Sequence, residues 1–85
     1  MRPDNVRLFI KSFCPWCHKA EQWLDQHDVS YEVIDVLEDS EAMNEMVKLS
    51  GQDLAPVIEV DGKILADFGP DELEEWWKDE GFAKK

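Results

Sequence analysis

Two cysteines, Cys14 and Cys17, are the only ones in the chain, and they flank a Pro-Trp pair where the sequence pattern changes. Before them, residues 6–10 form a short apolar run that predicts a strand. After them, apolar side chains recur every three or four residues, which predicts an amphipathic helix: Ala20, Trp23, Leu24 and His27. Pro15 lies where this helix would begin, and a first-turn proline loses no hydrogen bond because its missing N–H would be unpaired there. The pattern therefore places Cys14 at the mouth of a helix and Cys17 within its first turn.

This placement favours redox chemistry at the first cysteine. The first turn of a helix presents unpaired N–H groups and roughly half a positive charge, which stabilise an anion. A thiolate is such an anion, and it is the nucleophile in disulfide exchange. Lys11 and Lys19 add positive potential nearby. We therefore predict that Cys14 is the attacking nucleophile and that Cys17, one helical turn on and more buried, is the resolving thiol.

The same residues permit other interpretations. Cys-x-x-Cys followed by His18 is also the signature of c-type haem attachment, but that chemistry requires export, and we recognise no signal peptide before the motif. A zinc site needs about four ligands, and the motif offers at most Cys14, Cys17 and His18. A metal or iron–sulfur cluster carrier, with the cluster shared between two chains, stays as a less favoured hypothesis. We expect no bound cofactor and no metal ligands.

Length and charge restrict the classes of partner. Eighty-five residues predict one small domain over residues 1–85, which we expect to be a monomer. The net charge of −11 opposes binding to nucleic acid or to an anionic membrane surface. No stretch approaches the roughly eighteen apolar residues of a membrane span. Since residues 1–5 lack the apolar core of a signal peptide, we expect a cytoplasmic protein, and in that reducing compartment a cysteine pair is more often catalytic than structural.

The rest of the chain supplies a second strand and helix, followed by a hairpin and a last helix. Residues 31–36 alternate as a strand does, and a helix capped by Asp39 or Ser40 follows through Leu49, with Gly51 ending it. A helix between two strands implies a right-handed crossover and parallel pairing.

The second half of the chain predicts antiparallel pairing. Residues 54–60 and 63–66 are apolar runs on either side of Asp-Gly, a strong hairpin signal, and Pro56 is expected to open the first strand. Residues 69–72 begin the last helix, which Gly81 ends, and residues 83–85 are expected to fray. The expected fold is of the α/β class, in the order β-α-β-α-β-β-α, with a four-stranded mixed sheet flanked by three helices.

This order, together with Cys-Pro-Trp-Cys, resembles the glutaredoxin branch of the thioredoxin-like family over nearly the whole chain. Lys11 and the cysteine motif are similar to the family's Lys-x-x-Cys-Pro-Tyr-Cys. Residues 54–56, Leu-Ala-Pro, resemble its Thr-Val-Pro, in which the proline is cis. Residues 69–72, Gly-Pro-Asp-Glu, occupy the place of its Gly-Gly-x-Asp.

The resemblance implies roles in binding glutathione as a reducing co-substrate. Cys14 would form the mixed disulfide with glutathione or with a protein. Lys11 would approach the glycine carboxylate of glutathione, and Trp16, in the tyrosine position, would wall the groove. Ala55, just before Pro56, would pair with the backbone of the glutathione cysteine, as a sheet edge pairs with an added strand.

The last helix carries one implied contact and two departures from the family pattern. Asp71 would take the γ-glutamyl ammonium of glutathione. Pro70 lacks the N–H that relatives aim at the γ-glutamyl carboxylate. Phe68 replaces the first glycine of the pair and is expected to add bulk at the groove.

Phe-x-Pro-Asp resembles instead the glutaredoxin-like redoxins that thioredoxin reductase reduces, which bind glutathione poorly and often serve ribonucleotide reductase. Our principal interpretation is a glutathione-dependent dithiol oxidoreductase acting on disulfide-containing or glutathionylated proteins. The alternative is a redoxin recharged by thioredoxin reductase.

Overall fold

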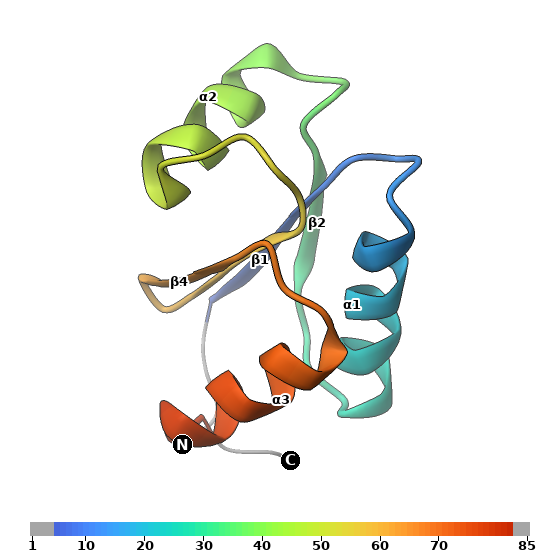
Figure 1. Cartoon of the computed structure of the whole chain (residues 1–85), viewed down its shortest axis with the longest axis vertical. Coiled ribbons are helices and arrows are strands. Elements are labelled where there is room, and N and C mark those ends of the chain that lie inside the picture. Colours follow the sequence, from blue (N-terminus) through green and yellow to red (C-terminus); the bar gives the residue numbers. More distant parts are fainter. Residues whose placement is uncertain (1–4, 83–85) are drawn as a thin grey trace.

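The computed structural model describes residues 5–82, and within them strands and helices follow one another in the predicted order (Figure 1). No helix of this segment combines the length and the apolar composition that crossing a bilayer requires. The prediction of fraying at residues 83–85 lies outside the described part. The elements are β1 (Val6–Ile10), α1 (Pro15–Gln26), β2 (Glu32–Asp35), α2 (Ser40–Ser50), β3 (Val57–Val60), β4 (Lys63–Ala66) and α3 (Pro70–Asp79).

The strands form one mixed sheet in the order β2-β1-β3-β4. β1 pairs in parallel with β2, as the crossover through α1 predicts, and antiparallel with β3, so that Leu8 lies between Val33 and Ile58. β3 and β4 form the predicted hairpin around Asp61 and Gly62, whose φ angles of 50° and 90° suit a tight two-residue turn. The predicted mixed sheet is therefore confirmed, with β1 at its centre.

Helices cover both faces of this sheet, α1 and α3 on one face and α2 on the other (Figure 1). On the first face, buried residues of β1 and β3 pack against both helices, and Trp77 of α3 is fully buried there against Trp23 of α1. On the second face, Phe9 and Val57 pack against Met46 of α2. Burial of large side chains such as Trp77 and Phe9 provides the main stabilising free energy of so small a sheet.

The third strand begins one residue later than the sequence predicts. Pro56 was expected to open a strand within the apolar run 54–60, whereas β3 begins at Val57. Leu54 donates its N–H to the side chain of Gln52, and Pro56 follows a cis peptide bond and has no N–H, so neither continues the ladder. Residues 54–56 therefore form a separate loop before the strand, and this loop reaches the cysteines.

Candidate active site

Cys14 caps the N-terminus of α1 with its sulfur. Its backbone is extended, with φ −91° and ψ 111°, and its Sγ accepts a hydrogen bond from the N–H of Cys17 at 3.2 Å. A serine or aspartate oxygen usually takes this capping position. Pro15 occupies the first helical position, as predicted, and the Cys14 N–H donates to the carbonyl of Lys11 at 3.0 Å. The sulfur of Cys14, a partly buried residue, therefore lies at the positive end of the helix.

Cys17 faces the opposite way, into the core. Its side chain is fully buried beneath the first turn of α1, among the residues that pack on the sheet. Burial, followed by a hydrogen bond to the Cys14 sulfur, raises the pKa of the Cys17 thiol to about 12, although a backbone hydrogen bond with Lys11 acts in the opposite direction. The geometry thus divides the pair into an accessible sulfur and a buried thiol that keeps its proton at neutral pH.

A loop distant in sequence forms the opposite wall of the site. The carbonyl of Ala55 lies 3.9 Å from the Sγ of Cys14, within reach of a hydrogen bond from the thiol. The peptide bond between Ala55 and Pro56 is cis, as the resemblance implied. The structure therefore brings four of the predicted site residues together: Cys14, Cys17, Ala55 and Pro56.

Three exposed apolar side chains lie next to site residues in the sequence. Phe13, just before Cys14, is 74% exposed, Trp16 in the first turn of α1 is 53% exposed, and Leu54, just before Ala55, is 52% exposed. The exposure of Trp16 was predicted, whereas Phe13 and Leu54 were not recognised as site residues. Their signal was available, because each directly precedes a predicted site residue outside any regular element. Together they give the site an apolar rim that a protein partner can cover.

Trp16 connects the cysteine loop to the start of α3. Its indole packs so closely on Gly69 that a Cβ built there would lie 3.1 Å from the ring. Lys19, three residues further along α1, holds its ammonium 4.4 Å from the ring centroid. The Gly69–Trp16 contact places the first turn of α3, and with it Asp71, on the Trp16 side of the site.

Phe68 is not at the groove. Its side chain is 4% exposed and belongs to the core on the α1 and α3 face, so the expectation that it adds bulk beside the cysteines is wrong. Its neighbour Gly69 lies instead against the Trp16 ring. The side chain that departs from the family pattern is therefore part of the core.

Lys11 and Asp71 are the predicted site residues that lie apart from this group. Lys11 takes part through its backbone carbonyl, and Asp71 is exposed in the first turn of α3, where it lines a shallow hollow of about 240 Å³ on the outer face of that helix. Within residues 5–82, no hydrogen bond or ion pair joins either charged side chain to the cysteines. Their roles toward glutathione stay predictions.

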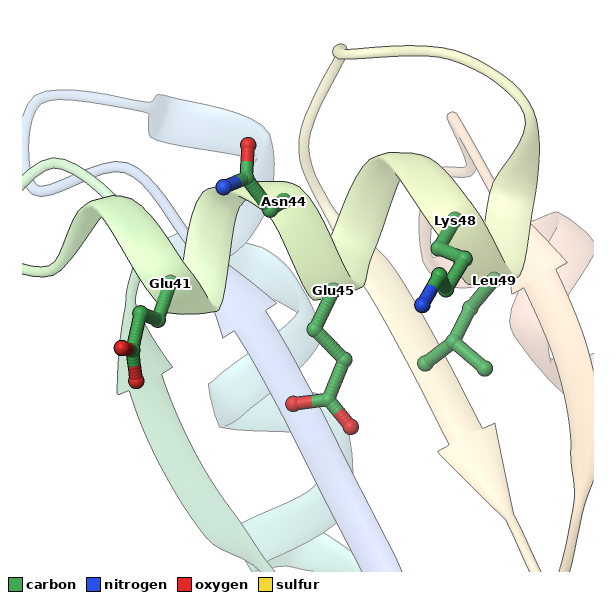
Figure 2. A pocket seen from close by; sticks show the side chains of 5 residues that line it. All are labelled: Glu41, Asn44, Glu45, Lys48 and Leu49. Carbon is green, nitrogen blue, oxygen red and sulfur yellow. The ribbon is translucent and has the colours of Figure 1, made fainter.

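A larger hollow, of about 420 Å³, lies on α2 (Figure 2). All the residues that line it belong to α2, and neither cysteine is among them. Glu45, Lys48 and Leu49 extend from the same side of the helix into it. Glu45 is also ion-paired at 2.8 Å with Arg7 of β1. The size of a hollow therefore does not locate the chemistry in this fold; the cysteine geometry does.

No group of three histidine, cysteine or carboxylate side chains gathers as a metal site would require, in the part of the chain that the structure describes. The Nε2 of His18 lies 3.3 Å from the carbonyl of Ser12, and its Nδ1 lies 4.0 Å from the Glu21 carboxylate.

Comparison with known proteins agrees with this chemistry. The sequence model of the glutaredoxin family matches residues 6–65, more than half of the chain. The chain belongs to the glutaredoxin family. It is 32% identical to glutaredoxin 3 of Escherichia coli K12 over 69 residues, covering 81% of each protein. It is 29% identical to the glutaredoxin-like protein NrdH of Lactococcus lactis, covering 80% of this chain and 93% of that one.

A solved structure confirms the fold of this glutaredoxin-family chain. A mutant of the thioredoxin-like protein BC3987 superposes with a TM-score of 0.78 at 24% identity, over 88% of this chain and 96% of that one. The predicted thioredoxin-like fold is therefore confirmed. As a member of the glutaredoxin family, the protein is a thiol–disulfide oxidoreductase.

The raised pKa values predict a loss of stability in alkali. Burial raises the pKa of Cys17 to about 12, and burial, followed by a hydrogen bond to Asp25, raises that of Tyr31 to about 12. Both groups ionise earlier in the unfolded chain, from 9.0 and 10.0, so their contribution is complete below those values and is lost as the pH rises toward 12. We expect the free energy of unfolding of the reduced protein to fall by at most about 1.4 kcal/mol per pH unit for each group.

Urea unfolding between pH 7 and 11 measures this loss. Cys17→Ala should flatten the decline that begins near pH 9, and Tyr31→Phe the part that begins near pH 10. A wild-type unfolding free energy that stays constant over this range would contradict the assigned burial of both groups.

Proposed function

We propose that the protein reduces disulfides by a two-cysteine exchange. The Cys14 thiolate attacks one sulfur of the substrate disulfide, the substrate S–S bond breaks, and the released thiolate takes up a proton. Cys17 then gives up its proton and attacks the Cys14 sulfur, which releases the second substrate thiol. The protein ends as the Cys14–Cys17 disulfide, and two electrons have passed to the substrate. The separation into an accessible and a buried sulfur supports this order of events.

We propose glutathione as the reductant. One glutathione thiolate attacks the oxidised pair and forms a mixed disulfide at Cys14, and a second releases glutathione disulfide and the reduced protein. One observation carries this proposal: residues 54–56 lie outside the ladder beside the Cys14 sulfur, and no hydrogen bond within residues 5–82 uses the Ala55 N–H. A short peptide bonded to Cys14 can pair with this backbone as an added strand does.

A second reductant, thioredoxin reductase, is favoured by the first turn of α3. The N–H of Gly69 donates to the Glu72 carboxylate at 2.9 Å, and Pro70 has no N–H. This turn therefore offers fewer free donors to a glutathione carboxylate than a helix N-terminus normally does. Similarity to the glutaredoxin-like NrdH protein supports the same alternative.

Coupled assays separate the two reductants. With NADPH consumption as the readout, we expect turnover of a glutathionylated protein and of a protein disulfide with glutathione and glutathione reductase. Thioredoxin reductase, in the absence of glutathione, should support only slow turnover. Rapid turnover with the reductase, together with no response to glutathione, would establish the redoxin function instead.

We further propose that the protein works as a monomer in the reducing cytoplasm, on disulfide-containing or glutathionylated proteins. The excess of acidic over basic residues, 20 against 9, supports partners other than nucleic acid and anionic membranes. The single cysteine pair suits a compartment in which thiols stay reduced.

A further inference from the structure

The indole of Trp16 is about half exposed, yet it contacts two other residues, Lys19 in the same helix and Gly69 at the start of α3. The Lys19 ammonium lies 4.4 Å from its ring centroid, where it meets the negative face of the π-system. Gly69, from the start of α3, lies against its six-membered ring. An exposed tryptophan with such contacts has less freedom to change rotamer than one in an unconstrained loop.

The glycine at position 69 is explained by space and not by backbone conformation. Its φ of −106° and ψ of −178° are extended values that any residue adopts. A Cβ at this position would lie 3.1 Å and 3.3 Å from two carbons of the Trp16 ring, and 3.0 Å from a carboxylate oxygen of Glu72. Any side chain here must move the indole or the Glu72 cap, so glycine leaves room for the ring.

Lys19 is placed by the helix itself. It follows Trp16 by three residues on α1, and side chains at this spacing are neighbours on a helix surface. The contact therefore depends only on the first turns of α1, the same turns that position Cys14 and Cys17. The indole, its two supports and the reactive sulfur form one local unit.

We propose that Lys19 and Gly69 are positioning residues that hold the Trp16 indole as a preformed wall beside Cys14, against which the chain flanking a substrate disulfide packs. A wall fixed in advance avoids the loss of rotamer entropy that ordering a free side chain on binding would bring. This inference rests on the proposed attack by Cys14. Under this proposal, Lys19 and Gly69 make the protein selective for disulfides with a bulky flanking chain, although neither residue contacts the reacting sulfur.

Two disulfides distinguish positioning from reactivity. One is a peptide disulfide with phenylalanine beside each cysteine, and the other is 2-hydroxyethyl disulfide, which is too small to cover the indole. Pre-reduced protein is mixed with each, and the second-order rate constant for loss of the reduced dithiol is measured by acid quenching and mass spectrometry, since Cys17 converts the first mixed disulfide into the Cys14–Cys17 disulfide. Because no reductant is present, the result does not depend on glutathione.

We expect Lys19→Met and Gly69→Ala to lower the rate constant with the peptide about two- to tenfold more than that with 2-hydroxyethyl disulfide. A loss of positive potential near Cys14 would slow the reaction with both disulfides by the same factor, so the ratio of the two rate constants reports the indole alone. Lys19→Arg should restore the wild-type rate because a guanidinium keeps the cation–π contact. Lys48→Met is the matched control, since it removes the same charge from α2, on the other face of the sheet (Figure 2).

Two further measurements test the mechanism directly. In protein labelled with 5-fluorotryptophan, the Trp16 resonance, identified by its loss in Trp16→Phe, should shift in Lys19→Met and Gly69→Ala but not in Lys48→Met. In a Trp16→Ala background, neither substitution should lower the peptide rate further.

An unshifted resonance, an equal loss with both disulfides, or a full additional loss in the Trp16→Ala background would overturn the proposal. A wild-type protein that 2-hydroxyethyl disulfide converts neither to a mixed disulfide at Cys14 nor to the Cys14–Cys17 disulfide would instead contradict the proposed function.

Discussion

Cys14→Ser is expected to reduce thiol transfer to the rate observed without protein, for every disulfide substrate and with either reductant. A serine hydroxyl stays protonated at neutral pH and does not displace sulfur from a disulfide, whereas a thiolate does. Serine is nevertheless a good N-cap, so its oxygen can accept the Cys17 N–H that the sulfur accepts at 3.2 Å. The substitution therefore removes the nucleophile and keeps the start of α1.

Comparison of two variants shows whether activity is lost because the nucleophile is absent or because the protein is less stable. The melting temperature of Cys14→Ser should match or exceed that of the wild type, while Cys14→Ala, which also lacks a cap, should be less stable by about 0.5–2 kcal/mol. Both should be inactive in the assay with 2-hydroxyethyl disulfide and in that with a protein disulfide. Measurable thiol transfer by Cys14→Ser would contradict this assignment. It would mean that Cys17 is the attacking cysteine, although its side chain is buried.

The parts of the fold that the sequence predicted correctly are those determined by local chemistry. Asp61 and Gly62 suit a tight turn whatever surrounds them, and Pro15 and Gly51 mark a helix start and a helix end by backbone geometry alone. The placement of Cys14 at the mouth of α1 follows from the same local rules, which is why the geometry of the cysteine pair was confirmed.

The parts that the sequence did not predict depend on contacts between distant segments. Phe68 directly precedes the predicted site segment 69–72, but its burial depends on packing with residues of α1 and α3. The contact of Trp16 with Gly69 joins residues 53 positions apart, and no periodicity within either segment indicates it.

Cys17→Ser is expected to separate the two kinds of substrate. Reduction of a glutathionylated protein should continue, because a second glutathione can release the mixed disulfide from Cys14 without a resolving thiol. Reduction of a protein disulfide should fall to near background, since the mixed disulfide with the protein then has no intramolecular route to release. Mass spectrometry of the unreduced reaction should show the two proteins linked through Cys14.

A polar hydroxyl in the fully buried position of Cys17 introduces a separate effect on stability, and Cys17→Ala controls for it. Both variants should show the same division between substrates, although Cys17→Ser should unfold at lower urea. In both, the backbone N–H of residue 17 still reaches the Cys14 sulfur, so the first attack should proceed at a rate close to that of the wild type. If attack on 2-hydroxyethyl disulfide instead fell sharply in Cys17→Ala but not in Cys17→Ser, whose hydroxyl can still donate, a proton on the residue 17 side chain would be needed to stabilise the Cys14 thiolate, and Cys17 would act in the first step as well as the second.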